Sequence, residues 1–262
     1  MIRAAVCGVG RTGSEVLRAI QDSDRFLLTA AFCRPGSEKA GKDVGDLLGK
    51  QRTGVLIRDA AQLEQTMRDT PTDVVIDFSN PAASRSLLRA CKGHRTNIVF
   101  CTTGYSEADI LWMKDFAQHH KIGVVFAPNV TLGINVLLAA LRLVAHALPS
   151  FDYQITETHH NKKYDIPSGT AKKLAAAIGE ELPKGAEVPI LSIRAGGYVG
   201  LHTVMLASDY ERISLTHESF SRRAFVEGAL VAAEFIYGRT GWYEMEDVLG
   251  MRAVQKAAAY VG

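Results

Sequence analysis

The sequence contains few cysteines, and they are far apart. Its 262 residues include four, at positions Cys7, Cys33, Cys91 and Cys101, with no Cys-x-x-C pair among them. This spacing supplies no zinc-binding frame, and isolated thiols are typical of a reducing compartment. We therefore expect reduced cysteines, no metal centre and a cytoplasmic location.

The chain also lacks an excess of charge and a long apolar run. Its formal net charge of +2 is too small to indicate a nucleic acid or a membrane surface as a partner. Charged residues interrupt the apolar runs before they reach the length that a bilayer requires, and the N-terminus has the pattern of a strand instead of a secretion signal. With 47% hydrophobic and 22% charged residues, the composition is that of a globular protein with one large domain or two modest ones.

Basic groups are concentrated in the stretch 157–171, which holds a His-His pair, a Lys-Lys pair and a Ser-Gly-Thr turn directly before a helical pattern. A helix that starts here presents its first N–H groups, at Gly169 and Thr170, as donors to a carboxylate. Clustered cations lower each other's pKa toward values that suit acid catalysis. Adjacent histidines in an extended segment point to opposite faces, which disfavours a shared metal ion. The stretch therefore indicates an anionic substrate, and a solvated polar loop with a helix cap is the alternative.

The N-terminal sequence predicts a strand, a glycine-rich turn and a helix. An apolar run at 2–7 precedes Gly-Val-Gly-Arg-Thr-Gly, and a helical pattern follows at 14–21. In this context the glycines permit a tight turn, a close approach to a pyrophosphate and the packing of the helix on the strand. A purely structural turn is the alternative. We predict dinucleotide binding by Gly8, Val9, Gly10, Arg11, Thr12 and Gly13.

The residue that selects the ribose of the cofactor should follow the next predicted strand, at 27–32. A carboxylate there would bind the 2′-hydroxyl of NAD, whereas an arginine would accommodate the 2′-phosphate of NADP. This chain has Cys33 and Arg34 at that point. Because Arg34 can pair with a phosphate or stack on the adenine, the sequence predicts a preference for NADPH, with NADH as the second cofactor.

Three further strands are predicted at 73–78, 97–101 and 124–127, alternating with helices. Ligands of an open parallel sheet bind beyond the carboxyl ends of its strands. Each end taken alone is an ordinary turn, but all three carry small or polar residues. Together they outline a nicotinamide crevice formed by Phe78-Ser79, Cys101-Thr102-Thr103-Gly104 and Ala127-Pro128-Asn129.

After a long helix predicted at 134–148, strands follow at 153–157, 190–194, 202–207 and 213–216. Consecutive strands predict a mixed or antiparallel sheet with one face on helices. The fold class is therefore α/β. We expect a Rossmann-type parallel-sheet domain at 1–129, completed by about 239–262, and an α+β domain for substrate binding and oligomerisation, with a mixed sheet, at 130–238.

From position 159 the chain reads His-His-x-x-Lys-x-Asp-x-Pro-Ser-Gly-Thr-Ala, which resembles the signature of the dihydrodipicolinate reductase family. The Asp-Phe-Ser-x-Pro, Thr-Thr-Gly and Ala-x-Asn segments at 77–81, 102–104 and 127–129 are also similar to that family, so the resemblance covers nearly the whole chain. It implies NAD(P)H-dependent reduction of a cyclic imine dicarboxylate, 4-hydroxy-tetrahydrodipicolinate, in lysine and diaminopimelate biosynthesis. It also implies a homotetramer formed through the mixed sheet.

The resemblance further implies roles for single residues. His159 is the expected proton donor and Lys163 its partner acid. The substrate carboxylates are expected at His160, Lys163, Gly169 and Thr170, with Arg222 as a further substrate-side candidate. The cofactor is expected against Cys101, Thr102, Thr103, Ala127, Pro128, Asn129 and Val130.

The chain departs from the family pattern at three places. Its glycine loop is one residue shorter than the usual Gly-x-x-Gly-Arg-Met-Gly, with Thr12 in place of Met. Cys33 stands where many members have an acidic residue, and Leu201 stands where they have a glutamate before a histidine. Two alternative functions remain, a related NAD(P)-dependent amino-acid dehydrogenase and a non-catalytic dinucleotide-binding sensor. The complete His-His to Thr-Ala signature argues against the first, and the shortened loop supports the second.

Overall fold

The computed structural model describes residues 1–252 of the chain. The described chain forms two compact units. The first comprises Met1–Val130 together with Phe225–Leu249, and the second comprises Thr131–Ala224 and, of the described C-terminal residues, 250–252. None of the helices in the described residues has the length and apolar character needed to cross a membrane.

A seven-stranded parallel sheet forms the centre of the first unit. Its order is β11-β6-β5-β4-β1-β2-β3, so the order along the chain reverses between β1 and β4. Ligands of such folds bind at this reversal point. The strands are β1 (Ile2–Cys7), β2 (Phe26–Cys33), β3 (Ile57–Asp59), β4 (Val74–Asp77), β5 (Asn97–Phe100), β6 (Gly123–Phe126) and β11 (Gly241–Tyr243).

Helices cover this parallel sheet, and two of its inner strands are accordingly buried along their whole length. The residues of β4 and β5 are buried throughout, because both faces of each strand pack against side chains. Phe32, Phe100 and Met113 lie in this core, and at most 1% of each residue is exposed. The helices are α1 (Arg11–Gln21), α2 (Val44–Leu48), α3 (Leu63–Asp69), α4 (Ser84–Cys91), α5 (Glu107–His119), α8 (Arg223–Ile236) and α9 (Met245–Val248), with the 3-10 turns η1 (Ala60–Gln62) and η2 (Pro81–Ala83).

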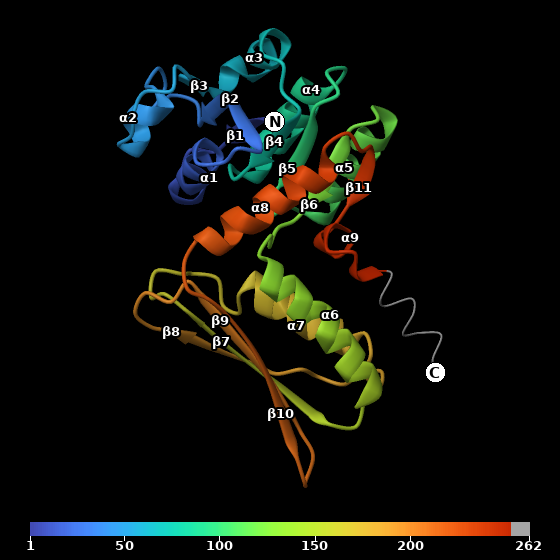
Figure 1. Cartoon of the computed structure of the whole chain (residues 1–262). Helices are drawn as coiled ribbons and strands as arrows, with labels where there is room; N and C mark the ends of the chain where they lie inside the picture. The colour runs from blue at the N-terminus through green and yellow to red at the C-terminus, as the bar shows by residue number, and fades with distance from the viewer. Residues whose placement is uncertain (253–262) are drawn as a thin grey trace. The chain divides into compact units, whose positions relative to one another are not determined.

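The second unit contains a four-stranded sheet in the order β10-β9-β7-β8. Strands β7 (Asp152–His159) and β8 (Ile190–Arg194) are parallel, whereas β9 (Gly200–Ala207) and β10 (Arg212–Ser219) run antiparallel to their neighbours, so the sheet is mixed. Helices α6 (Leu132–Ala147) and α7 (Gly169–Gly179) pack on one face of this sheet (Figure 1). Burial alternates along β9, which is the pattern expected of a sheet with one covered face. The predicted fold class is confirmed in both units.

The register of the mixed sheet brings polar side chains together at one end of its covered face. Glu157 lies opposite His202 on β9, and His159 lies opposite Arg194 on β8. Since alternate residues of a strand share a face, Glu157 and His159 point the same way. The apolar part of the face, around Ile155 and Val204, therefore gives way to a cluster of ionisable groups at the carboxyl end of β7.

Helix α8 was expected in the second domain but groups with the first unit from Phe225 onward. Three contacts explain this. A Cβ at Gly228 would lie 1.8 Å from the carbonyl oxygen of Val130, Arg25 forms a 2.7 Å ion pair with Glu234, and the amide of Asn97 donates to the carbonyl of Ile236. The limit at residue 238 is therefore a correction to the sequence prediction.

Three further elements differ from the sequence prediction. Strands β3 and β11 and helix α3 were not predicted, because each is short and its pattern is weak. Of the segment at about 239–262 that was expected to complete the first domain, the part beyond residue 252 lies outside the described residues, and its helix α9 begins at Met245.

The close approach of α8 to Val130 predicts a strong difference between two helical glycines. Gly228→Ala should lower the free energy of unfolding by about 1–3 kcal/mol or more, because the new methyl group overlaps a backbone oxygen that cannot rotate away. The control is Gly179→Ala at the end of α7, where nothing lies within 4 Å of the new Cβ. Urea unfolding curves measure both, and equal midpoints for the two variants would contradict the packing described here.

Candidate functional site

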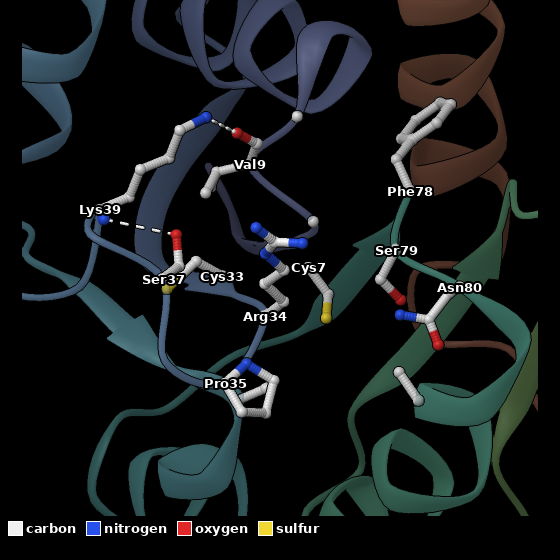
Figure 2. Close-up of a pocket in the computed structure, with 14 residues that line it drawn as sticks. Cys7, Val9, Cys33, Arg34, Pro35, Ser37, Lys39, Phe78, Ser79 and Asn80 are labelled. Carbon is white, nitrogen blue, oxygen red and sulfur yellow. Dashed lines mark hydrogen bonds between the residues drawn. The ribbon is translucent and has the colours of Figure 1, made fainter.

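A cavity of about 420 Å³ lies beyond the carboxyl ends of β1, β2 and β4 in the first unit (Figure 2). This is the reversal point of the sheet order, where dinucleotide folds bind their ligand. The lining residues are Cys7, Gly8, Val9, Gly10, Cys33, Arg34, Pro35, Ser37, Lys39, Ala60, Phe78, Ser79, Asn80 and Ala83. Five of the predicted cofactor residues therefore share one cavity.

The glycine loop beside this cavity depends on two close backbone approaches. Gly8 has a φ of +92°, and a Cβ there would lie 2.5 Å from the carbonyl oxygen of Phe78. A Cβ at Gly13, in the first turn of α1, would lie 1.8 Å from the carbonyl oxygen of Gly8. Gly10 caps α1, so the first N–H groups of that helix, at Arg11 and Thr12, have no carbonyl of the preceding turn to bind. A backbone shaped in this way fits a pyrophosphate.

Two cations and no carboxylate are found among the described residues that line the cavity. Arg34 is exposed, and the Nζ of Lys39 donates a 2.6 Å hydrogen bond to the carbonyl oxygen of Val9, as Figure 2 shows. Cys33 is buried and donates from Sγ to the carbonyl of Arg58 at 3.4 Å. Sequence reasoning did not select Lys39, because it lies in a loop without periodicity.

The buried carboxyl group of Asp77 lies beneath the ends of β4 and β5. One oxygen accepts from the N–H of Ser79 at 3.1 Å and from its hydroxyl, and the other accepts from Thr102 at 3.1 Å. Burial raises the pKa of Asp77 to about 6, although these hydrogen bonds oppose the shift. Asp77 therefore connects a residue of the cavity to one of the predicted nicotinamide contacts.

The other predicted cofactor residues lie outside the lining of the cavity. Arg11, Thr12 and Gly13 form the first turn of α1. The others follow β5 and β6, the next two strands of the sheet beyond β4: Cys101, Thr102 and Thr103 come after β5, and Ala127, Pro128, Asn129 and Val130 come after β6. The ends of neighbouring parallel strands share one edge, so both groups lie on the edge that carries the cavity. Their contact with a cofactor stays a prediction.

In the second unit, a charged network surrounds His159 at the end of β7. Nδ1 of His159 donates to Glu157, whose second oxygen accepts a 2.8 Å hydrogen bond from Arg194 and a 3.2 Å hydrogen bond from the N–H of Ser168. Glu157 has no exposed surface, and only 7% of His159 is exposed. The ring of His202 lies 5.1 Å from that of His159, nearly perpendicular to it.

The network sets the protonation of its members. Burial raises the pKa of Glu157, but hydrogen bonds from Arg194 and His159 outweigh it and hold this pKa at about 2. Burial lowers the pKa of His159, with contributions from the charges of Lys163 and Arg194, while Glu157 opposes the shift. Burial also lowers the pKa of His202, to about 4. The network therefore holds an ionised carboxylate and two imidazoles that burial favours in the neutral form.

The turn after β7 and the start of α7 together bind a carboxylate. Ser168 caps α7, since its hydroxyl accepts from the N–H of Ala171 at 3.2 Å. The Nζ of Lys163 lies 2.8 Å from an oxygen of Asp165, and the N–H of Gly169 also donates to that carboxylate. Two of the predicted substrate-binding groups are thus brought together around a carboxylate of the chain itself.

The remaining predicted substrate residues lie at different distances from this network. The N–H of His160 donates to the carbonyl of Tyr198 at 2.8 Å, which keeps His160 beside the network, and Thr170 is in the first turn of α7. Arg222 is in the turn between β10 and α8. Within residues 1–252, no hydrogen bond or ion pair connects it to the network. Its role stays a prediction.

Glu157, His159 and His202 each place one potential ligand atom within 4.8 Å of the others, which is a geometry that could hold a metal ion. Both oxygens of Glu157 already accept hydrogen bonds from Arg194 and His159. A metal cation would have to share the carboxylate with the guanidinium of Arg194 and the imidazole of His159. The contacts therefore favour a hydrogen-bonded network, and the absence of a metal centre stays a prediction.

Sequence reasoning did not identify the role of Glu157 and Arg194 in this network. Both lie in segments that were noted, but nothing in a single sequence pairs β7 with β8. The useful signal is a charged residue at an inward position of a predicted strand, since such a charge needs a partner.

Two family models match the sequence. One, described as dihydrodipicolinate reductase, N-terminus, covers residues 2–130, and one described as dihydrodipicolinate reductase, C-terminus, covers residues 133–249. The 4-hydroxy-tetrahydrodipicolinate reductase of Methanopyrus kandleri is 39% identical over 270 residues, which cover 95% of this chain and 97% of that protein. The protein of the same name from Hahella chejuensis is 38% identical over 273 residues, with coverage of 96% and 100%.

Solved structures share the fold. Dipicolinate-bound dihydrodipicolinate reductase from Paenisporosarcina sp. TG-14 has a TM-score of 0.76 at 24% identity, covering 93% of this chain and 97% of that one. Amine dehydrogenase from Mycobacterium smegmatis has a TM-score of 0.67 at 13% identity, covering 91% and 93%. At these identities the likeness concerns the fold alone.

The raised pKa of Asp77 predicts a pH dependence of stability. Folding favours its protonated form, so the stability that this form contributes is present at low pH and is lost as the pH rises through about 6. Between about pH 4.5 and 7.5 the wild type should lose about 2 kcal/mol relative to Asp77→Asn, which carries no titrating group there. Urea unfolding at both pH values measures this difference. Asp46→Asn, at an exposed carboxyl group of α2, is the control, and parallel pH profiles for wild type and Asp77→Asn would contradict the assignment.

Proposed function

We propose that this chain, which belongs to the dihydrodipicolinate reductase family, reduces 4-hydroxy-tetrahydrodipicolinate to tetrahydrodipicolinate with NAD(P)H and a proton, and that the 4-hydroxyl group leaves as water. This reaction is a step of lysine and diaminopimelate biosynthesis. The relatives that share 33% to 39% of their residues with this chain carry the name of that activity. Because the chain covers nearly their whole length, both the cofactor-binding and the substrate-binding parts are included.

One observation of the second unit carries the proposal. A buried imidazole, held by a buried carboxylate, lies beside groups that bind a carboxylate of the chain itself. A dicarboxylate substrate needs both features: cationic and N–H donors to orient it, and an acid close to the ring that accepts the hydride.

The residues have the following proposed roles. His159 gives a proton to the reduced ring, because the electron pair that arrives with the hydride builds negative charge there. Lys163 is the partner acid and, with Gly169 and Thr170, holds a substrate carboxylate in the position that Asp165 occupies. His160 and Arg222 complete the substrate contacts.

The glycine loop of the first unit fits a dinucleotide, since side chains at Gly8 and Gly13 would overlap backbone atoms that shape the cavity. Bound NAD(P)H supplies the hydride. The loop and the N-terminus of α1 hold the pyrophosphate, and the residues after β5 and β6 contact the nicotinamide. Arg34 and the absence of a lining carboxylate among the described residues favour the 2′-phosphate of NADPH.

We further propose a homotetramer formed through the mixed sheet, and a cytoplasmic location. The sheet face opposite α6 and α7 carries Leu191 and Ile193 on β8, which are 57% and 41% exposed, and the half-buried Met205 on β9. A second copy of the chain would remove this apolar surface from water. The four cysteines are free, which suits a reducing compartment.

Cofactor preference is the first prediction of this proposal. With freshly generated 4-hydroxy-tetrahydrodipicolinate, kcat/KM should be higher for NADPH than for NADH. Arg34→Met should lower the value for NADPH about 10- to 100-fold and leave the value for NADH nearly unchanged, because a charge-assisted contact to one phosphate is lost. Arg52→Met, at an exposed arginine paired with Asp46, is the control. An equal or higher kcat/KM with NADH in the wild type would refute the preference.

Tight NADPH binding without turnover would instead favour one of the two alternatives, a non-catalytic sensor or an enzyme with a different substrate.

The second prediction concerns Lys163. Lys163→Ala should lower kcat by about 10²- to 10⁴-fold, the range of general acid–base catalysis, with an unchanged unfolding midpoint and unchanged NADPH affinity. Lys162→Ala removes an adjacent exposed ammonium group and should keep near-normal turnover. Steady-state kinetics of both variants decide the matter: near-normal turnover of Lys163→Ala would remove Lys163 from the mechanism.

A further inference from the structure

Glu157 is a buried charge that the proposed reaction does not use directly. It has no exposed surface, and it lies on β7 on the same face as His159. A buried carboxylate is costly unless donors surround it, so its presence next to the proposed proton donor needs a physical reason. The geometry of its hydrogen bonds supplies one.

Each oxygen of Glu157 has a separate set of donors. One accepts from Nδ1 of His159, and the other accepts from the guanidinium of Arg194 at 2.8 Å and from the N–H of Ser168 at 3.2 Å. Arg194 is itself fixed, because it also donates to the backbone carbonyls of Lys163 and Asp165 at 3.3 and 2.7 Å. The carboxylate therefore has one orientation, and with it the imidazole has one orientation.

We propose that Glu157 is a positioning residue that keeps a proton on Nδ1 of His159, so that Nε2 is the nitrogen that delivers the proton to the substrate. The delivery step rests on the function proposed above, whereas the tautomer is a property of the protein alone. Glu157 acts through His159 and does not contact the substrate.

The surroundings of the second ring nitrogen agree with this assignment. Within the described residues, no hydrogen bond from a protein group engages Nε2 of His159. A Cβ at Gly200 would lie 3.2 Å from Nε2, so a glycine at that position on β9 keeps the space beside this nitrogen open. The nitrogen left open for a reactant is therefore Nε2.

The charges around His159 give Glu157 a second effect. The ring faces Glu157 on its own strand, Lys163 in the following turn, Arg194 on β8 and His202 on β9. The two cations and burial lower the pKa of His159, and Glu157 is the anion that opposes them. A proton donor must be protonated at Nε2, so turnover is lost as the pH rises through the pKa of His159. Removing the negative charge moves that loss to lower pH.

The decisive variant is Glu157→Gln. The amide of Gln can donate to Nδ1, which reverses the tautomer, as in the Asp→Asn variants of serine proteases. We expect kcat to fall about 100-fold at neutral pH and the descending limb of the kcat–pH profile to move to lower pH. The dissociation constant of dipicolinate, used as a non-reacting dicarboxylate probe, should change less than about threefold, since its proposed ligands are untouched.

A direct readout needs no substrate. Nitrogen-15 NMR of uniformly labelled wild type, with the His159 signals assigned by their loss in His159→Gln, should show a protonated Nδ1 and an unprotonated Nε2 at pH values above the pKa of this ring. In Glu157→Gln the proton should move to Nε2. A wild-type His159 with its proton on Nε2 would overturn the proposal.

Two variants separate positioning from mere packing. Glu157→Asp keeps the charge, so it should keep the descending limb near its wild-type pH and recover part of kcat. Glu181→Gln changes a comparable pair on the surface, in which Nδ1 of His146 lies 3.2 Å from Glu181, and should behave as wild type.

The outcomes distinguish the two proposals. A Glu157→Gln variant with wild-type kcat, or one with low kcat, an unmoved limb and a lowered urea midpoint, would show that Glu157 has no positioning role. If the wild type binds NADPH but reduces no substrate, the proposed function fails, and the NMR measurement still decides the tautomer.

Discussion

A carboxylate without exposed surface must be surrounded by donors, and the part of the second unit around His159 supplies them to Glu157. Its donors come from three elements: His159 on β7, Arg194 on β8 and the N–H of Ser168 at the start of α7. Removing one partner of such a buried ion pair costs on the order of 3–5 kcal/mol, so the elements are held together strongly. Arg194 extends the same constraint to the turn that carries Lys163, because it binds two carbonyls of that turn. Glu157 therefore contacts the imidazole and the start of α7 directly and the turn of Lys163 through Arg194.

The first unit shapes its site by a different means. Its cavity exists because side chains are missing where the backbone comes close: at Gly8 against Phe78, and at Gly13 against Gly8. Lys39 and Arg34 line this cavity with cationic groups, and the hydrogen-bond network of Asp77 lies beside it. A backbone cradle suits a cofactor whose phosphates are the same in every reaction, whereas a network of titratable side chains suits a substrate that must receive a proton.

How far the sequence predicts this molecule depends on the range of each interaction. Five strands of the parallel sheet (β1, β2, β4, β5 and β6), the glycine loop before α1 and the stretch around His159 follow from local patterns, and the structure contains all of them. Strands β3 and β11 are too short for a recognisable sequence pattern. They form because they pair with β2 and β6, and this pairing is a tertiary interaction. The same holds for Lys39, which reaches back to Val9, and for α8, whose glycine fits Val130. Glu157 and Arg194 could be recognised singly as inward charges, but their register was not readable from one sequence.

In the proposed substrate site, the carboxylate of Asp165, held by Lys163 and the N–H of Gly169, is an internal competitor. A tethered group close in sequence presents itself at an effective concentration on the order of millimolar or above, so any anion from solution has to outcompete it. A small inorganic anion makes few further contacts and gains little by the exchange. With the proposed contacts at His160 and Arg222, a dicarboxylate would gain a second set of contacts when it displaces Asp165, so the tether would filter ligands by the number of carboxylates they carry. Selectivity of this kind comes from what the empty site already holds and needs no additional contact with the correct ligand.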